Sequence, residues 1–257
     1  MNIKTISIIG SGNLATQLAK AFYREGIAIN QIFSRDIEHA VALASLVNSK
    51  ATDNFGDLTP VDIIIIAVSD SAILEVSNSL NRLSCLVVHT SGSTSIDILE
   101  NRTNFGVFYP FQTFSKNVDI EFTSIPILIE ADTLVNQELL TSLATVLSSN
   151  VQVVNSLQRL KLHLAAVFAS NFSNHMYAIT YQLLNESGLS FEMIKHLIEE
   201  TTRKAIESNN PALVQTGPAS RENFQIMESH KELIANRPLW QKIYTFVSDS
   251  IMDMQKR

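Results

Sequence analysis

A glycine turn near the amino terminus constrains the fold of this chain more than any other feature. The apolar run 5–10 ends in Gly10-Ser11-Gly12, and the amphipathic pattern of a helix follows at once. The spacing Gly10-x-Gly12-x-x-Ala15, between a strand and a helix, matches the fingerprint of dinucleotide-binding domains. Gly10 permits the tight turn, Gly12 lets the backbone approach a pyrophosphate, and small Ala15 lets the helix pack on the sheet. The alternative, a tight turn without a ligand, is disfavoured by this context.

The first part of the chain alternates β-branched runs with helical periodicity, which is typical of a parallel α/β sheet. The expected strands are residues 5–10, 29–34, 61–69, 85–90, 105–110, 125–130 and 151–155. The expected helices are residues 13–25, 36–48, 70–81 and 133–148. We therefore predict a Rossmann-type parallel sheet domain over residues 1–155.

Helical patterns alone follow residue 155. They are interrupted at Gly188, Pro211, Gly217-Pro218 and Pro238, and residues 156–187 read as one long helix. We predict an all-helical C-terminal domain over residues 156–257.

The composition excludes several classes of protein. The chain has 257 residues, of which 46% are hydrophobic and 17% charged, as in an ordinary globular protein. The formal charge of -6 and the lack of a Lys/Arg run argue against a nucleic-acid or anionic-membrane partner. No stretch approaches the length of a membrane span, and the single Cys85 cannot form an intramolecular disulfide. We expect a cytoplasmic protein that acts on a small molecule and has no metal site.

The residues around the glycine turn and the end of the second strand are candidates for holding the cofactor. Backbone N–H groups at the helix start would hold the phosphates. NAD-binding proteins generally place a carboxylate at the end of the second strand, whereas Ser34 and Arg35 suit a 2′-phosphate. This predicts NADP rather than NAD; the alternative is that Arg35 is a surface residue and Asp36 caps the next helix. The cofactor-binding candidates are Gly10, Ser11, Gly12, Asn13, Leu14, Ser34, Arg35, Val68 and Ser69.

Polar residues also follow the later strands, whose carboxyl ends should line the same crevice. His89, Ser91 and Ser93 lie in the run HTSGS, which is either a site beside a nicotinamide or a simple turn. The run Tyr109–Thr113 follows the next strand. Asp70 is better explained as the cap of the following helix.

The long helix carries a second polar group. Ser170, Asn171, Asn174 and His175 lie close together at helical spacing, whereas His163 lies nearer the start of the helix. Buried amides are costly unless they meet partners, which would be a substrate or a neighbouring backbone. His163 is either a catalyst or a buried core residue, and Arg221 is either an anion anchor or a surface residue.

Six motifs together resemble a family of Rossmann-like proteins with a C-terminal domain of unknown function, usually described as NADP-dependent oxidoreductases. The motifs are IGSGNLA, AVSD, HTSGS, YPFQTF, HLAAVFASNF and TGPASREN. The layout is more distantly similar to pyrroline-5-carboxylate reductase, ketopantoate reductase and the β-hydroxyacid dehydrogenases. The resemblance implies a substrate site between the domains and a homodimer formed through the helical domain.

One departure affects the chemistry. Ketopantoate reductase and β-hydroxyacid dehydrogenases carry a lysine four residues before an asparagine of the first long helix. Here that position is Val167 or Ser170, depending on which asparagine matches. A histidine would have to replace the proton donor.

These observations predict an oxidoreductase that transfers a hydride between NADP and a small carbonyl, imine or hydroxy compound. His89 or His163 would handle the proton, and Asn171 and Asn174 would orient the reactants. Ser91, Ser93, His175 and Arg221 would contact the substrate. Two alternatives are a non-catalytic NADP-binding sensor or partner protein, and a dehydrogenase of a prephenate-like acid, which would need a cation such as Arg221.

Overall fold

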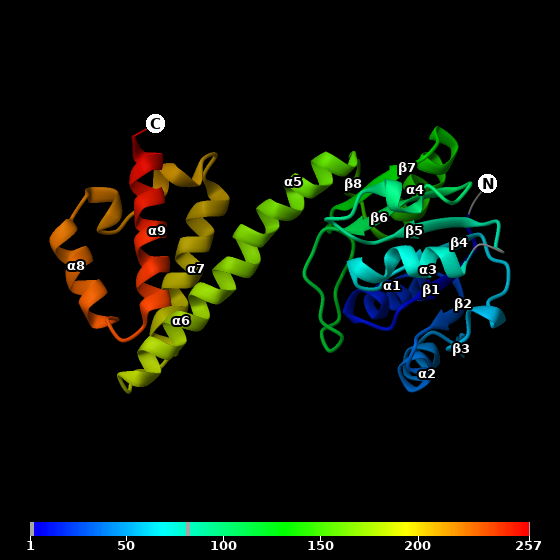
Figure 1. Ribbon diagram of the computed structural model, residues 1–257, viewed down its shortest axis with the longest axis horizontal. Coiled ribbons are helices and arrows are strands. Elements are labelled where there is room, and N and C mark those ends of the chain that lie inside the picture. Colours follow the sequence, from blue (N-terminus) through cyan, green and yellow to red (C-terminus); the bar gives the residue numbers. More distant parts are fainter. Residues whose placement is uncertain (1–2, 81–82, 257) are drawn as a thin grey trace. The chain divides into compact units, whose positions relative to one another are not determined.

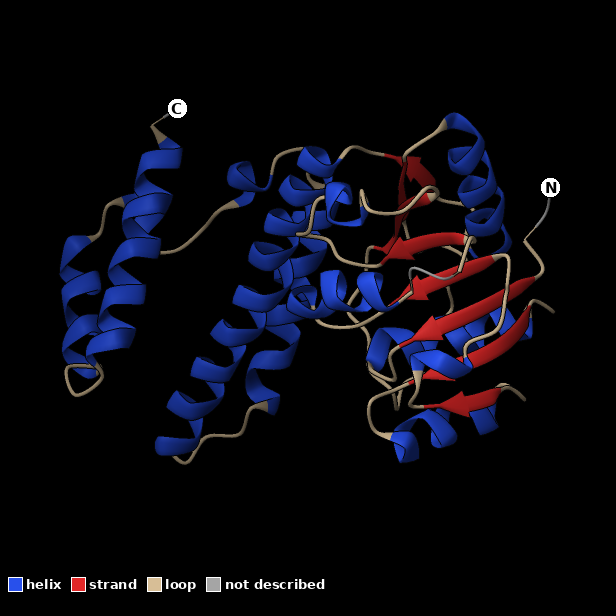
Figure 2. Ribbon diagram, turned by 45° about the vertical axis from the view of Figure 1, so that its right-hand side comes forward, coloured by secondary structure: helices blue, strands red, loops and turns tan. Residues whose placement is uncertain are grey.

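The computed structural model describes residues 3–80 and 83–256, which form two compact units, Met1–Ser173 and Asn174–Arg257. The strands of the described residues all belong to the first unit, and the second unit contains only helices and turns (Figures 1 and 2). The first unit thus extends past residue 155, where we expected the helical domain to begin, and includes the start of the long helix. No helix within the described ranges combines the length and apolarity that a membrane span requires.

The sheet of the first unit has eight strands in the order β3-β2-β1-β4-β5-β6-β7-β8. The strands are β1 (Thr5–Ile9), β2 (Ala28–Phe33), β3 (Lys50–Thr52), β4 (Ile63–Ile66), β5 (Leu86–His89), β6 (Phe105–Pro110), β7 (Ile127–Ala131) and β8 (Val151–Val153). The Rossmann-type α/β class is confirmed. The sheet is parallel, as expected, except at one pairing, where β6 and β7 run antiparallel. A loop without a crossover helix joins them, which suffices for antiparallel neighbours.

Helices cover both faces of this sheet (Figure 1). They are α1 (Asn13–Arg24), α2 (Ile37–Leu46), α3 (Ile73–Ser79) and α4 (Leu134–Leu147), with short 3₁₀ turns at η1 (Phe55–Asp57), η2 (Asp70–Ala72) and η3 (Ile96–Leu99). The helix predicted over 156–187 consists of α5 (Ser156–Ala166), the π-helical turn η4 (Val167–Phe172) and α6 (Ser173–Glu186). The second unit adds α7 (Glu192–Glu207), η5 (Pro211–Val214), η6 (Ala219–Arg221), α8 (Phe224–Leu233) and α9 (Pro238–Gln255).

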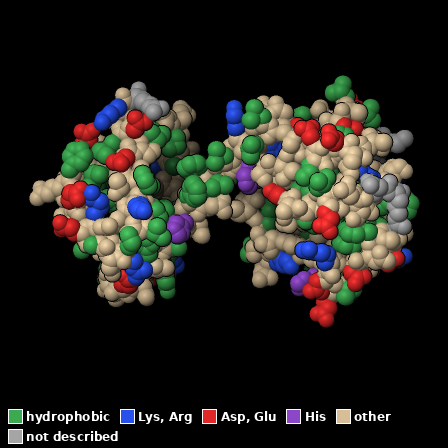
Figure 3. Space-filling view, in the orientation of Figure 1, with side chains coloured by type: hydrophobic (Ala, Val, Ile, Leu, Met, Phe, Trp, Pro, Cys, Tyr) green, Lys and Arg blue, Asp and Glu red, His purple; other side chains and the backbone are tan. Residues whose placement is uncertain are grey.

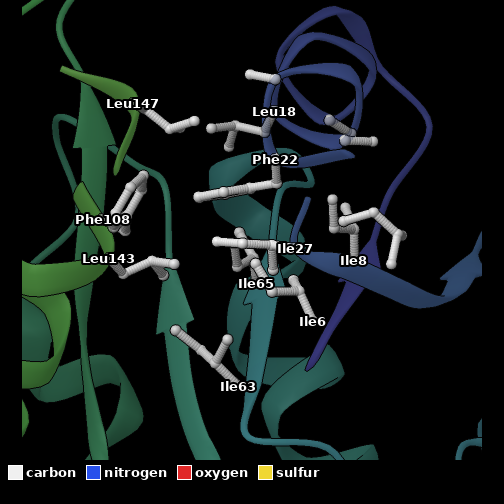
Figure 4. Close-up of a cluster of buried hydrophobic side chains, with 14 of the residues drawn as sticks. Ile6, Ile8, Leu18, Phe22, Ile27, Ile63, Ile65, Phe108, Leu143 and Leu147 are labelled. Carbon is white, nitrogen blue, oxygen red and sulfur yellow. The ribbon is translucent and has the colours of Figure 1, made fainter. Parts of the chain in front are cut away.

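The core of the first unit lies on both sides of the sheet, because side chains alternate along each strand. Ile63 and Ile65 of β4 pack into the larger cluster, with Phe22 of α1 and Leu143 of α4 (Figure 4). The other two isoleucines of β4 pack into a smaller cluster on the opposite face, which includes Ile73 of α3. This packing holds the carboxyl ends of β1, β2, β4 and β5 at one edge, where the cofactor candidates lie.

The second unit has very little core of its own. Among its described residues only Ala219, Met227 and Ser248 are buried. Large apolar side chains are instead exposed on each of its four α-helices, and apolar side chains are exposed along α5 of the first unit as well (Figure 3).

Candidate nucleotide-binding and catalytic site

The backbone conformation and the packing at position 10 both require a glycine. Its φ of +127° lies in the region that favours glycine, and a Cβ there would stand 2.2 Å from the Ala67 carbonyl oxygen. The Gly10 N–H donates to the Phe33 carbonyl at 2.8 Å. This glycine therefore lets the turn pass between the ends of two neighbouring strands.

Gly12 has the opposite environment. A Cβ at this position would meet nothing within 4 Å, so the space beside it is open. Gly12 is the N-cap residue of α1, no side chain caps that helix, and its first turn contains no acidic residue. The first N–H groups of α1 therefore face open space at the positive end of the helix dipole, which is a suitable site for an anion.

A cavity of about 680 Å³ opens at this helix start. It is lined by eight of the nine predicted cofactor residues, namely Ser11, Gly12, Asn13, Leu14, Ser34, Arg35, Val68 and Ser69. Gly10, the ninth, shapes the turn behind it. Sequence analysis did not predict His39 and Phe55, which line the same cavity together with Thr90 of the HTSGS run. The open cradle at Gly12 and the uncapped helix start fit a dinucleotide diphosphate.

The end of β2 determines which ribose substituent this cavity suits. Asp36 accepts hydrogen bonds from the backbone N–H groups of Glu38 at 3.0 Å and His39 at 3.4 Å, so it caps α2, as the alternative to the NADP prediction proposed. Ser34 is buried and its Oγ accepts from Ser11 Oγ at 3.0 Å. The Asp36 carboxylate is thus engaged by its helix, whereas the exposed Arg35 lines the cavity.

His89 occupies an environment that does not suit proton transfer to a substrate. It is fully buried at the end of β5, and its Nδ1 accepts from the Ser91 N–H at 3.1 Å. Burial, and then the nearby Arg159 guanidinium, lower the pKa of His89 to about 4. Our expectation that His89 handles the proton needs correction, because the imidazole is neutral near pH 7 and enclosed.

The HTSGS run forms a turn, as its alternative interpretation proposed. The buried Ser91 Oγ donates to Thr94 Oγ1 at 2.9 Å and accepts from the Thr94 N–H at 3.0 Å, so it is not placed to bind substrate. Ser93 is exposed, and its hydroxyl donates to the Asp70 carboxylate. No side chain caps η2 or α3, so the predicted capping role of Asp70 is wrong.

A buried ion pair that sequence analysis missed holds this turn. The Arg159 side chain, on α5, is 1% exposed and pairs with Glu130 of β7. Arg159 Nε also donates to the Ser91 carbonyl at 3.2 Å, and Nη2 donates to the Thr94 carbonyl at 2.6 Å. The turn after β5 is therefore fixed to α5 and, through the ion pair, to β7.

Beside this turn lies a second cavity, of about 430 Å³, between the end of β6 and the helix α5–η4. Tyr109 and His163 line it, with Tyr109 Oη 3.3 Å from His163 Nδ1. Two members of the predicted polar group, Ser170 and Asn171, also line it from η4. π turns are rare in proteins, and those that occur within α-helices are frequently found at functional sites.

The other predicted substrate residues do not line this cavity. Asn174 and His175 belong to the second unit, where Asn174 lines a shallow pocket with Tyr177 and Lys195. His175 and Arg221 are exposed. The predicted group of four therefore spans the boundary between the two units.

Comparisons with known proteins agree with the fold. The family model described as "NADP oxidoreductase coenzyme F420-dependent" matches residues 5–93, and the model described as "Domain of unknown function (DUF2520)" matches residues 125–251. No curated protein matches the chain.

Three solved structures share the architecture over nearly the whole chain. A protein from Thermotoga maritima is 23% identical, with a TM-score of 0.73 over 98% of this chain and 100% of that chain. A pyrroline-5-carboxylate reductase from Coxiella burnetii is 17% identical, with a TM-score of 0.56 over 99% of this chain and 98% of that chain. These two likenesses concern the fold alone.

The third similarity is much stronger. A putative NADP oxidoreductase from Bacteroides fragilis is 39% identical, with a TM-score of 0.90 over 98% of both chains. The chain therefore belongs to the family of putative NADP oxidoreductases in which a Rossmann-like domain precedes a C-terminal domain of unknown function.

Proposed function

We propose that the protein is an NADP-dependent oxidoreductase that acts on a small carbonyl, imine or hydroxy compound. The observation that carries the proposal is the uncapped start of α1, which opens at Gly12 into a cavity lined by the residues that the fingerprint predicts. Family membership supports binding of a nicotinamide cofactor.

The chain's own residues bind and orient the cofactor. Backbone N–H groups of Gly12, Asn13 and Leu14 hold the diphosphate, and Ser34 and Arg35 hold the 2′-phosphate. When bound, the cofactor supplies a hydride, while the protein supplies position and electrostatic field. NADP is favoured over NAD because Ser34 and Arg35, which suit a 2′-phosphate, both line the cavity.

Calorimetric titration with NADPH and NADH tests the binding step. Gly12→Val should retain the fold, since its φ of -74° is open to any residue and nothing lies nearby, but it should abolish NADPH binding. Arg35→Ala should weaken NADPH binding about tenfold or more and leave NADH binding unchanged. The matched control is Arg24→Ala, an exposed arginine that does not line the cavity. Wild-type protein that binds neither nucleotide would overturn the proposal.

Turnover separates an enzyme from a non-catalytic sensor. NADPH oxidation should be followed by absorbance against a panel of small ketones, keto acids and imines, and NADP reduction against alcohols. We expect turnover with at least one class. Tight binding without turnover across the panel would support the sensor instead.

We also propose that two copies of the chain associate. Leu157, Leu160 and Leu164 form an exposed stripe on α5 at spacings of three and four residues, away from the buried Arg159. The second unit buries too few apolar side chains to offset the entropy of folding, and an identical chain supplies a matching apolar surface.

Sedimentation velocity tests this association. The wild type should sediment as a dimer and Leu164→Asp as a weaker dimer or a monomer. Leu134→Asp, at an exposed leucine of α4, is the control and should leave the dimer intact. A monomeric wild type at micromolar concentration would contradict the proposal.

A further inference from the structure

We propose that Tyr109 is the catalytic acid–base residue of this site, that His163 positions and reprotonates it, and that the substrate is an uncharged carbonyl compound. The inference rests on the proposed function. It assigns the proton donor that neither the absent helix lysine nor the enclosed His89 provides.

The sheet places Tyr109 next to the cofactor cavity. β5 and β6 pair in parallel, with His89 opposite Val107. Two residues further along β6, Tyr109 lies beside the turn that follows β5. Thr90, at the start of this turn, lines the cofactor cavity, and Gly92 reaches the Tyr109 side chain. One short turn therefore touches both cavities.

Gly92 shows that the turn and the Tyr109–His163 pair fit closely. A Cβ at position 92 would stand 2.7 Å from His163 Nδ1, from Tyr109 Cζ and from Tyr109 Oη. The φ of Gly92 lies outside the region that favours glycine, so the backbone conformation does not require a glycine here. The position needs glycine because a side chain would collide with the Tyr109–His163 pair. The phenol and imidazole are thereby held against the backbone of the turn. The distance between Tyr109 Oη and His163 Nδ1 is one that a bound substrate can shorten.

The cavity lining indicates the charge of the substrate. Besides Tyr109 and His163 it offers apolar groups such as Phe111, Leu162 and Ala166, and uncharged polar groups such as Gln112 and Asn171. None of the lining side chains of this cavity is an Asp, Glu, Lys or Arg. A carboxylate in the cavity would meet no cation there, which disfavours keto acids and prephenate-like acids.

The surroundings of Tyr109 keep its proton on the phenol until a substrate accepts it. Burial and then the Asp70 carboxylate raise the pKa of Tyr109, and Arg159 opposes them. His163 and the neutral His89 are the other titratable groups near this turn. A protonated phenol donates a hydrogen bond to a carbonyl oxygen, so Tyr109 acts as an acid in the reducing direction.

The proton and electron balance is simple. A bound reduced nicotinamide would supply the hydride and its electron pair to the carbonyl carbon, and the Tyr109 phenol would give its proton to the carbonyl oxygen, which becomes a hydroxyl. The Tyr109 phenolate would then be reprotonated by a solvent proton that His163 relays through Nδ1. Alcohol oxidation reverses each transfer.

The test compares Tyr109→Phe with Tyr244→Phe. Tyr244 makes the same kind of pair, with Oη 2.9 Å from His230 Nδ1, but on the second unit. We expect Tyr109→Phe to reduce kcat for an uncharged ketone 10²- to 10⁴-fold while the Kd for NADPH stays within twofold of wild type. Tyr244→Phe should change neither. His163→Gln should lower kcat less, about tenfold, and shift the pH profile.

A measurement without cofactor tests the pair directly. The ring nitrogen resonances of His163, assigned from the loss of signal in His163→Gln, should shift in Tyr109→Phe and stay in place in Tyr244→Phe.

Three results overturn the inference. Wild-type kcat in Tyr109→Phe, in protein that binds NADPH, contradicts the role of Tyr109 but leaves the proposed function standing. Keto acids that outperform matched neutral ketones contradict the substrate class. NADPH binding without turnover of any ketone contradicts the inference together with hydride transfer.

Discussion

The sheet unit and the helical unit differ in how much apolar surface they bury. All four isoleucines of β4 are fully buried in the first unit, whereas Ile206, Leu213 and Leu233 of the second unit are each about 80% exposed. Burial of apolar surface is the main stabilising contribution to folding. The first unit therefore contains its own source of stability, whereas the described residues of the second unit bury little apolar surface.

The charged groups of the two units differ in the same way. Arg159 and Glu130 pair inside the first unit, where the pair holds the turn between the two cavities. Arg203 pairs with Glu200 and Glu207 on the exposed surface of α7. An unpaired buried charge is costly, whereas water screens an exposed one. The Arg159–Glu130 pair thus holds a turn beside the candidate site in the first unit. The Arg203 pairs in the second unit lie on the exposed surface of one helix.

The largest difference in the free energy of unfolding should appear between alanine substitutions of two phenylalanines, one in each unit. Phe22→Ala removes a fully buried ring that packs 5.8 Å from Phe108, between centroids, and should lower the free energy of unfolding by about 3–5 kcal/mol. Phe246→Ala, at a ring that is 71% exposed, should change it by less than about 0.5 kcal/mol in a monomer. Urea unfolding followed by circular dichroism measures both. If Phe246→Ala costs as much as Phe22→Ala at high protein concentration only, a second copy covers that ring.

The buried ion pair should give the next largest effect. Arg159→Met leaves the Glu130 carboxylate without its partner and should destabilise the protein by about 3 kcal/mol. The double variant Arg159→Met/Glu130→Gln should recover much of that loss, because no unpaired charge remains. Equal unfolding midpoints for the wild type and Arg159→Met would show that the pair contributes nothing.

The lowered pKa of His89 predicts that the stability of the sheet unit depends on pH. Its pKa is lowered from 6.5 to about 4, so between these values the unfolded chain binds a proton that the folded chain does not. Stability should therefore fall as pH drops from 6.5 to 4, by up to about 3 kcal/mol from this residue. Unfolding of His89→Gln at pH 7 and pH 4.5 should lack this component, whereas the exposed His196→Gln should behave as wild type. Parallel pH profiles for His89→Gln and wild type would refute the assignment.

The surface charges of α7 should give the smallest effect. Arg203→Ala should leave the unfolding midpoint unchanged at physiological salt, because water and ions screen the guanidinium group and its two carboxylate partners. A clear loss of stability that salt does not remove would show that this surface is buried in an assembly.

Sequence reasoning succeeded where the relevant residues are neighbours along the chain. The turn from Gly10 to Leu14 and the end of β2 at Ser34 and Arg35 each form a contiguous stretch, and the sheet topology brings such strand ends to one edge. That is why the cofactor cavity was predictable. The strand β3 was not predicted, because three residues give no usable periodicity.

The second cavity, lined by Tyr109 and His163, was harder to predict because it depends on contacts between distant segments. Tyr109 and His163 are 54 residues apart, and nothing local to either marks the other as its partner. Arg159 was missed because arginines are usually exposed. Spacing alone grouped Asn171 with Asn174, although the boundary between the two units lies between them.

The central claim is that bare backbone N–H groups at the start of α1 bind the cofactor diphosphate, and amide chemical shifts report on them directly. In ¹⁵N-labelled protein titrated with NADPH, the amides of Gly12, Asn13 and Leu14 should show the largest shifts. In Gly12→Val, the amides of Asn13 and Leu14 should not shift when NADPH is added. Saturating NADPH that perturbs other amides and leaves these three in place would contradict the account.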